Sequence, residues 1–325
     1  MYQSTHSTIG YRSFILFCLI GLLGCKREND SPLPSSGQKT PWNIEQIGGF
    51  VDMSQSSKTA WILDTGVDLD HPDLNIDRQR SRSFVPESPS LVDAMSHGTH
   101  VAGIIGAKNN DFGVVGVAAG IRIVSVKVIY QGTRDPSGNI TRGLEYVLSD
   151  VASGDVVNMS YGFEASVSSG QYEKMRKLIQ QIADKGAYVV FAAGNSSRDM
   201  AKPPLAPTLL DISDYDYTSP SGGRIFAVAA TNRSGKVTFY SNYGTAVKYL
   251  APGGEGTNAE EGISSTIPSG GPSQHKEGEY SYQSGTSQAA PHVAGILLVN
   301  NGVIPIRGTE THPGDRKAYP VARLK

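Results

Sequence analysis

Residues 59–66 read Thr-Ala-Trp-Ile-Leu-Asp-Thr-Gly, an apolar run that ends on a carboxylate and a turn. Four more short apolar runs follow along the chain, and segments with helical periodicity separate them. Strands that are apolar on both faces and alternate with helices are typical of a parallel sheet covered on both sides. The pattern predicts a three-layer α/β fold, with strands at 59–63, 121–129, 155–159, 188–192 and 225–229 and helices at 100–107, 139–152, 171–185 and 287–300.

The composition of the 325-residue chain is that of an ordinary soluble enzyme. Its 29 Lys and Arg residues balance 30 Asp and Glu residues, for a formal net charge of -1. A protein that binds nucleic acid by neutralising phosphates usually has a basic excess, and a disordered acidic tail has the opposite imbalance. No repeat of fixed period is visible, which excludes solenoids and propellers. We therefore expect a globular domain that does not bind nucleic acid.

The N-terminus has the features of an export signal. Residues 14–24 form an apolar run after Arg12 that is well short of the ~20 residues a spanning helix needs. The run ends in Leu-Leu-Gly-Cys, which resembles a bacterial lipobox and predicts a lipid on Cys25; an ordinary or uncleaved signal is the alternative. Because the only other cysteine is Cys18, the domain that follows has no internal disulfide and no thiol nucleophile. The expected organisation is a signal peptide at 1–24, the lipid-anchor cysteine and a tether at 25–37 and one domain at 38–325, attached to a membrane of the bacterial cell envelope.

Three segments contain the residue types that serine-based acyl transfer requires. Asp64 directly follows the first predicted strand, His97 lies in Ser-His-Gly-Thr-His-Val-Ala-Gly at 96–103, and Ser287 lies in Gly-Thr-Ser-Gln-Ala-Ala-Pro-His at 285–292. A serine nucleophile needs a base that accepts its proton and a carboxylate that holds the base in the correct tautomer. In a parallel sheet such chemistry collects at the carboxyl ends of the strands, where Asp64 is expected.

These segments, in the order Asp, His, Ser, resemble the motifs of the subtilisin family of serine peptidases. The resemblance extends from residue 38 to about residue 305 and implies a subtilisin-like fold and a serine endopeptidase. It also implies that Asn195, in Ala-Ala-Gly-Asn at 192–195, donates a side-chain hydrogen bond to the oxyanion, with the backbone N–H of Ser287 as the second donor. It implies no redox or organic cofactor.

The resemblance also assigns a surface that binds polypeptide substrates in an extended conformation. Main-chain hydrogen bonds would supply affinity there, and a pocket would accept the side chain before the scissile bond. We expect the protein to act as a monomer. The substrate-binding residues implied are Ser160, Tyr161, Gly162, Ala192, Ala193 and Gly194.

A structural calcium ion is a further implication of the resemblance. Gln38, Asp73 and Asn110 match side-chain ligands of the family's calcium site, and the loop that contains Asn110 has the matching length. Oxygen ligands in such number suit Ca²⁺. The alternative is a surface turn in which Asn and Asp serve the backbone conformation. Carbonyl ligands would come from Lys108, Phe112 and Val114.

Other histidines are interpreted as structural. His97 and His100 are spaced like a metal-binding pair, but no third ligand has suitable local spacing. His71 and His292 are assigned, with His100, to packing.

The chain departs from the family at three places. Gln288 follows the proposed nucleophile where the family commonly has an oxidisable methionine. The residues between Cys25 and Gln38 are too few for a folding pro-region, and we expect an abbreviated C-terminal part.

A catalytically silent peptide-binding relative is the alternative function, although such a module has no need of both His97 and Asn195. An esterase of the Gly-x-Ser-x-Gly type does not match the sequence around Ser287.

Overall fold

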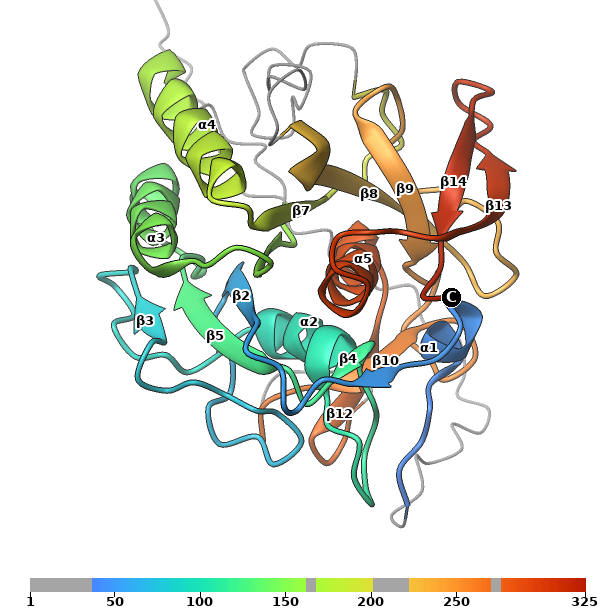
Figure 1. Ribbon diagram of the computed structural model, residues 1–325, viewed down its shortest axis with the longest axis horizontal. Helices are drawn as coiled ribbons and strands as arrows, with labels where there is room; N and C mark the ends of the chain where they lie inside the picture. Colours follow the sequence, from blue (N-terminus) through green and yellow to red (C-terminus); the bar gives the residue numbers. More distant parts are fainter. Residues whose placement is uncertain (1–36, 162–167, 201–221, 270–275) are drawn as a thin grey trace, which may run out of the picture.

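The computed structural model describes residues 37–161, 168–200, 222–269 and 276–325, whose arrangement Figure 1 shows. The predicted signal peptide at 1–24, Cys25 and Gly162 lie outside the described residues. In the ranges described, no helix is both long and apolar enough to cross a membrane.

A nine-stranded sheet, parallel at its centre, forms the middle layer (Figure 1). All neighbouring strands pair in parallel, except for the two strands of a hairpin at one edge, which are antiparallel. The predicted α/β class with a mostly parallel sheet is confirmed. In spatial order the strands are β13 (Ile306–Thr311), β14 (Ala318–Ala322), β9 (Val247–Pro252), β8 (Ile225–Thr231), β7 (Tyr188–Ala192), β6 (Val156–Met159), β2 (Thr59–Asp64), β5 (Arg122–Lys127) and β3 (Arg82–Ser83).

The central strand β2 shows why the sheet must be covered on both faces. All of its residues are buried. Ala60 and Ile62 belong to one hydrophobic core and Trp61 and Leu63 to another, because successive side chains of a strand point to opposite faces. The apolar surface removed from water on both sides stabilises the fold by roughly 25 cal/mol per Å².

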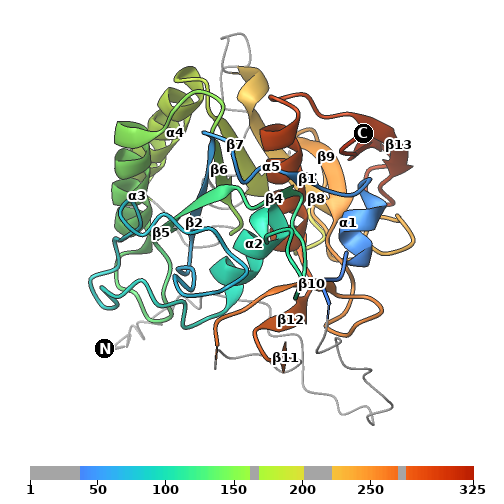
Figure 2. The same ribbon diagram turned by 60° about the horizontal axis from the view of Figure 1, so that its bottom comes forward.

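Helices form the two outer layers (Figure 2). The amphipathic helices α3 (Pro136–Asp150) and α4 (Ser169–Asp184) pack over the core that contains Trp61. On the other face lie α2 (His97–Gly106) and α5 (Thr286–Val299), which are buried almost all round. Their burial explains why neither helix contains Asp, Glu, Lys or Arg.

Smaller elements enclose α2 and α5 from outside. The sheet of β10 (Ile263–Thr266), β12 (Tyr280–Gln283) and β11 (Lys276–Glu277) contacts α2 through β10. Gly103 permits this approach, because a Cβ atom there would lie 2.3 Å from Thr266 Oγ1. The remaining elements are α1 (Trp42–Gln46), β1 (Val51–Asp52), which pairs with β4 (Ala118–Ala119), and the short 3₁₀ helix η2 (Gly222–Arg224).

The main differences from the predicted elements concern their ends. The helix predicted from residue 100 begins at His97, so that the histidine lies in its first turn. The segment after residue 305, which has no clear periodicity in the sequence, forms the β13–β14 hairpin. Its side chains Tyr319 and Ala322 are buried, which anchors the hairpin at the sheet edge.

Candidate functional site

Asp64 and His97 form a hydrogen-bonded pair at the carboxyl end of the sheet. Asp64 is the last residue of β2 and is fully buried, whereas the His97 side chain at the start of α2 is 19% exposed. His97 Nδ1 lies 2.7 Å from Asp64 Oδ1. Since an ionised carboxylate only accepts hydrogen bonds, Nδ1 carries the hydrogen and Nε2 presents its lone pair.

The surroundings of His97 change its basicity. Burial lowers the pKa of His97, but the attraction of Asp64, the hydrogen bond to Asp64 and the charge of Asp93 raise it by more. The net pKa lies above the ordinary 6.5. The imidazolium form is therefore stabilised, as a base that accepts a proton from a hydroxyl requires.

Ser287 lies in the first turn of α5 and is tied to the end of β6. Its hydroxyl donates to the main-chain carbonyl of Ser160 at 2.7 Å. The Ser160 hydroxyl in turn donates to the carbonyl of Ser287 at 2.9 Å and accepts from Asn158 Nδ2 at 2.8 Å. The serine hydrogen is thus directed at the main chain, and rotation about a single side-chain bond would release it.

Asn195 follows β7 and faces the same helix start. Its Oδ1 accepts from the backbone N–H of Thr286 at 2.9 Å and from the Thr286 hydroxyl at 2.8 Å. Asn195 Nδ2 lies 3.2 Å from the position that a Cβ atom on Gly285 would take. The amide hydrogens are therefore held next to the turn that precedes Ser287.

Asn242, which belongs to none of the sequence motifs, holds the loop that carries Asn195. Its N–H donates to the carbonyl of Gly194, and its Nδ2 donates to the carbonyl of Ala193, both at 2.9 Å. Its Oδ1 accepts from the N–H groups of Ser196 and Arg198 at 3.0 and 2.9 Å. The only local signal is that an Asn before Tyr-Gly favours a turn, and such a signal says nothing about a partner loop.

The proposed substrate-binding residues follow two neighbouring strands. Ser160 and Tyr161 come directly after β6, and Ala192 ends β7, which pairs with β6 in parallel. Ala193 and Gly194 continue from β7 into the loop of Asn195. These five residues therefore follow the carboxyl ends of two central strands, and Ser160 among them is hydrogen-bonded to Ser287.

The predicted calcium ligands from three distant segments also come together. Asn110 Nδ2 donates to Asp73 Oδ1 at 2.9 Å, and the backbone N–H of Asn110 donates to Gln38 Oε1. Burial raises the pKa of Asp73, and hydrogen bonds from neighbours such as Val114 offset this only in part. The N–H of Lys108 donates to the Asp73 carbonyl at 2.9 Å, and that of Phe112 donates to Asn110 Oδ1 at 3.0 Å.

The described histidines other than His97 have protein partners. His100 Nε2 lies 3.0 Å from the Ile263 carbonyl and His71 Nε2 lies 3.1 Å from that of Glu279. Within the four described ranges, no three His, Cys, Asp or Glu side chains could hold a metal ion together.

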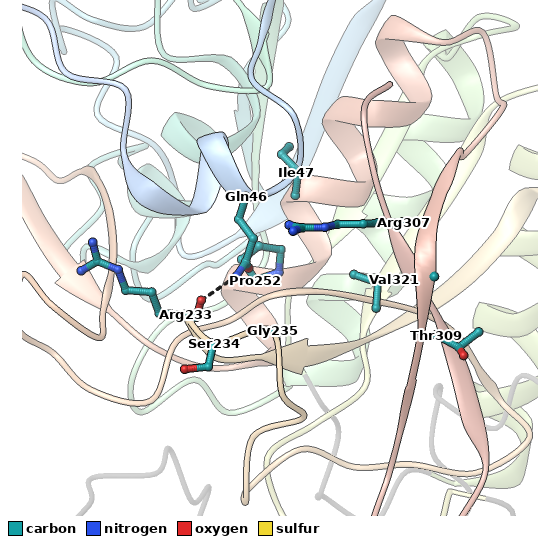
Figure 3. A pocket seen from close by; sticks show the side chains of 11 residues that line it. Gln46, Ile47, Arg233, Ser234, Gly235, Pro252, Arg307, Thr309 and Val321 are labelled. Atoms are coloured by element: carbon teal, nitrogen blue, oxygen red, sulfur yellow. Dashed lines mark hydrogen bonds between the residues drawn. The ribbon is translucent and has the colours of Figure 1, made fainter.

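A pocket of about 340 Å³ lies between α1, the turn at 233–235 and the β13–β14 hairpin (Figure 3). Across it Gln46 Nε2 donates to the Arg233 carbonyl at 2.8 Å. None of the candidate catalytic residues lines this pocket.

Known proteins resemble this chain in sequence. Residues 61–306 match the model of the subtilase family. The chain is 32% identical over 277 residues to subtilisin NAT of Bacillus subtilis subsp. natto, covering 84% of this chain but only 64% of that relative. It is 32% identical over 267 residues to a subtilisin of Bacillus pumilus, covering 81% of this chain and 84% of the relative.

Solved structures are similar over most of the chain. A protease of Pseudoalteromonas arctica shares 30% identity with a TM-score of 0.61, covering 80% of this chain and 84% of that structure. A cold-adapted subtilisin-like serine proteinase shares 25% identity with a TM-score of 0.61, covering 88% of this chain and 97% of that structure. The matches in sequence and in fold show that the chain belongs to the subtilase family.

Proposed function

We propose that the protein is a serine endopeptidase in which Asp64, His97 and Ser287 act as a catalytic triad. The observation that carries the proposal is the 2.7 Å hydrogen bond between Asp64 and His97, which orients an imidazole of raised pKa. The Asn195 side chain beside the first turn of α5 adds a donor for a developing negative charge.

The first half of the reaction forms an acyl-enzyme. The Ser287 hydroxyl rotates from the Ser160 carbonyl toward His97 and attacks the peptide carbonyl carbon, while His97 Nε2 accepts its proton. The tetrahedral intermediate then collapses as His97 donates that proton to the leaving amine. Asp64 stays ionised and stabilises the imidazolium.

The second half restores the enzyme. Water attacks the ester on Ser287 and gives a proton to His97, which returns it to the serine oxygen as the carboxylic acid leaves. In both halves the oxyanion accepts hydrogen bonds from Asn195 Nδ2 and from the backbone N–H of Ser287. Because these donors are already held in place, little reorganisation accompanies the reaction.

The substrate would be a polypeptide bound as an extended strand. Ser160 and Tyr161 would lie on one side of its main chain and Ala192 to Gly194 on the other. Subtilisins are among the relatives of this chain, and an extended polypeptide suits two segments that leave neighbouring parallel strands.

A calcium ion bound by Gln38, Asp73 and Asn110 is a second part of the proposal. Asn110 donates hydrogen bonds to Asp73 and to Gln38, which holds the three residues together. Their one carboxylate and two amide side chains contain oxygen ligands of the kind that Ca²⁺ prefers. When bound, the ion would link the segments at residues 38, 73 and 108–114 and so stabilise the fold. We expect chelation by EGTA to lower the melting temperature of the parent and not that of Asp73→Asn. If the parent melts at the same temperature with and without EGTA, the alternative of a simple surface turn is favoured.

We also propose that the protein is exported and held at the cell envelope by lipid on Cys25. The apolar run at 14–24 and the Leu-Leu-Gly-Cys sequence support this. Cys25→Ser should release the protein from the membrane fraction and abolish metabolic labelling with palmitate. Unchanged labelling and fractionation would contradict the anchor.

The endopeptidase proposal is tested with purified protein and unfolded casein. We expect the parent to cleave casein and Ser287→Ala, confirmed as folded by circular dichroism, to leave it intact. If a folded parent binds casein peptides but cuts none, the catalytically silent binding module becomes the better account.

A further inference from the structure

A second buried carboxylate, Asp93, lies beside the proposed triad and has no part in the mechanism above. Its side chain is 1% exposed. Oδ1 accepts from the Thr65 hydroxyl at 2.8 Å and the Met95 N–H at 3.1 Å. Oδ2 accepts from the N–H of Thr99 at 2.8 Å and from its hydroxyl at 2.7 Å. Burial and the charge of Asp64 raise the pKa of Asp93. The donors on both oxygens oppose this rise, because a protonated oxygen would face another donor.

The carboxylate serves as an external cap for α2. The N-cap residue of this helix makes no side-chain cap hydrogen bond. Instead, the N–H of Thr99 is satisfied by Asp93, and the N–H of Gly98 donates to Thr65 Oγ1 at 2.9 Å. A negative charge is also favourable at the N-terminus of a helix. The helical turn that begins with His97 is therefore held by groups outside the helix.

Thr65 connects Asp93 to the pair of Asp64 and His97. The N–H of Thr65 donates to Asp64 Oδ1 at 2.7 Å, the oxygen that His97 Nδ1 also contacts at 2.7 Å. Its hydroxyl donates to Asp93 and accepts from Gly98, the residue after the histidine. A displacement of Asp93 would thus be transmitted to both members of the pair.

We propose that Asp93 is a positioning residue for the peptidase reaction, which holds the first turn of α2 against Asp64 and places a second negative charge beside His97. The inference rests on the proposed function. It is supported by the pKa of His97, which burial lowers but which the charges of Asp64 and Asp93 raise above 6.5.

The other titratable groups around these residues do not replace that charge. His100, on the same helix as His97, has its pKa lowered by burial to about 3 and is neutral. Tyr161, after β6, has its pKa raised by burial and by Asp64, so it is neutral as well. Lys127, at the end of β5, faces the loop of Asp93, and its Nζ donates to the Val92 carbonyl at 2.7 Å.

The test compares Asp93→Asn with a matched control, Asp155→Asn. Asp155 is 2% exposed and also accepts hydrogen bonds from several neutral donors, including Trp61 Nε1 at 3.0 Å and the N–H of Thr59 at 2.8 Å. It lies near the opposite end of β2 from Asp64. Both variants replace a buried carboxylate that accepts several hydrogen bonds, but only Asp93 lies beside the proposed triad.

We expect Asp93→Asn to lower kcat on a peptide anilide by on the order of 10- to 100-fold, as small displacements of catalytic groups do. The acid limb of its kcat/KM profile should move to lower pH, because loss of a negative charge lowers the pKa of His97. Asp155→Asn should lower the melting temperature and move neither quantity. An acid limb that stays in place in Asp93→Asn, or that moves equally in Asp155→Asn, would overturn the proposal.

Two further measurements support the test. The first separates the position of the helix turn from the charge of Asp93, and the second measures the pKa of His97 without relying on activity. Thr65→Val removes the connecting hydroxyl but keeps the charge, so we expect lower kcat with the acid limb little changed, and rescue by Thr65→Ser. NMR titration of the His97 imidazole in the Ser287→Ala background, with assignment by His97→Gln, measures the effect of Asp93→Asn on the pKa directly. If the parent cleaves no peptide, the proposed function fails, whereas an unaltered His97 pKa in this titration would refute the role of Asp93 itself.

Discussion

The hydroxyl and the N–H of Thr286 both donate to the side-chain oxygen of Asn195, at 2.8 and 2.9 Å. An amide oxygen has two lone pairs, and this arrangement uses both. The orientation of the Asn195 amide is thereby fixed, with its hydrogens next to the turn that leads to Ser287. A donor held in this way before substrate arrives can stabilise charge that develops only in the transition state.

Asn195→Ala should therefore lower kcat with little effect on KM. We expect a loss on the order of 10²–10³, a range that comes from removal of the corresponding donor in subtilisin itself. Steady-state kinetics on a peptide anilide measure both constants. The control is Thr286→Val, which keeps the N–H that orients Asn195 and should lose less activity. Equal kcat values for Asn195→Ala and the parent would remove Asn195 from the mechanism.

Acid should destabilise the protein through buried histidines. Burial lowers the pKa of His292 to about 4, and its ring lies 2.9 Å from Asn43 Nδ2 and 2.8 Å from the Gln288 carbonyl. In the unfolded chain the His292 ring binds a proton near its ordinary pKa of 6.5, whereas in the folded protein it does so only near pH 4. The free energy of unfolding should therefore fall as the pH drops through this window.

Urea denaturation at a series of pH values measures this dependence. His292→Gln lacks the titrating ring, so its free energy of unfolding should vary less steeply with pH than that of the parent. The same slope in both proteins would show that His292 does not contribute.

Close packing between α2 and β10 should make Gly103 intolerant of a side chain. A Cβ atom there would lie 2.3 Å from Thr266 Oγ1 and 2.4 Å from Ser265 Oγ. We expect Gly103→Ala to lower the free energy of unfolding by about 1–3 kcal/mol, the usual cost of overpacking. Gly170→Ala is the matched control, because nothing lies within 4 Å of its Cβ position in α4. Gly170→Ala should leave the free energy of unfolding unchanged or raise it slightly. A comparable loss of stability in both variants would contradict the packing argument.

Gln288 should make the protein resistant to peroxide at the active site. Its side chain is 2% exposed and its Nε2 donates to Gln283 Oε1 at 3.1 Å. Gln288→Met would place an oxidisable thioether next to Ser287. We expect peptidase activity to decay faster in peroxide for this variant than for the parent, and identical decay curves would count against this role.

The candidate triad can be located from the sequence alone. Asp64, His97 and Ser287 lie in local motifs, and a residue at the end of a buried strand or the start of a helix is readable from its neighbours. The parallel sheet follows from the same alternation of apolar runs and helices, and the structure confirms it.

Residues defined by distant partners could not be predicted. Asn242 contacts a loop more than forty residues earlier in the chain, from Gly194 to Arg198, and its own neighbours signal only a turn. Asp93 lies close to His97 in sequence, yet its link to Asp64 depends on Thr65, which directly follows β2 and lies 28 residues before Asp93. The β13 strand is largely exposed, so it shows no apolar alternation, and its pairing with β14 defines it.

Covalent labelling tests the central claim most directly. A peptidyl phosphonate reacts with a serine that its histidine has activated, and tryptic mass spectrometry locates the adduct without knowledge of the natural substrate. We expect a single adduct on Ser287 in the parent, none in Ser287→Ala and greatly slowed labelling in His97→Ala. A folded parent that remains unlabelled, or that is labelled at another serine, would contradict the triad of Asp64, His97 and Ser287.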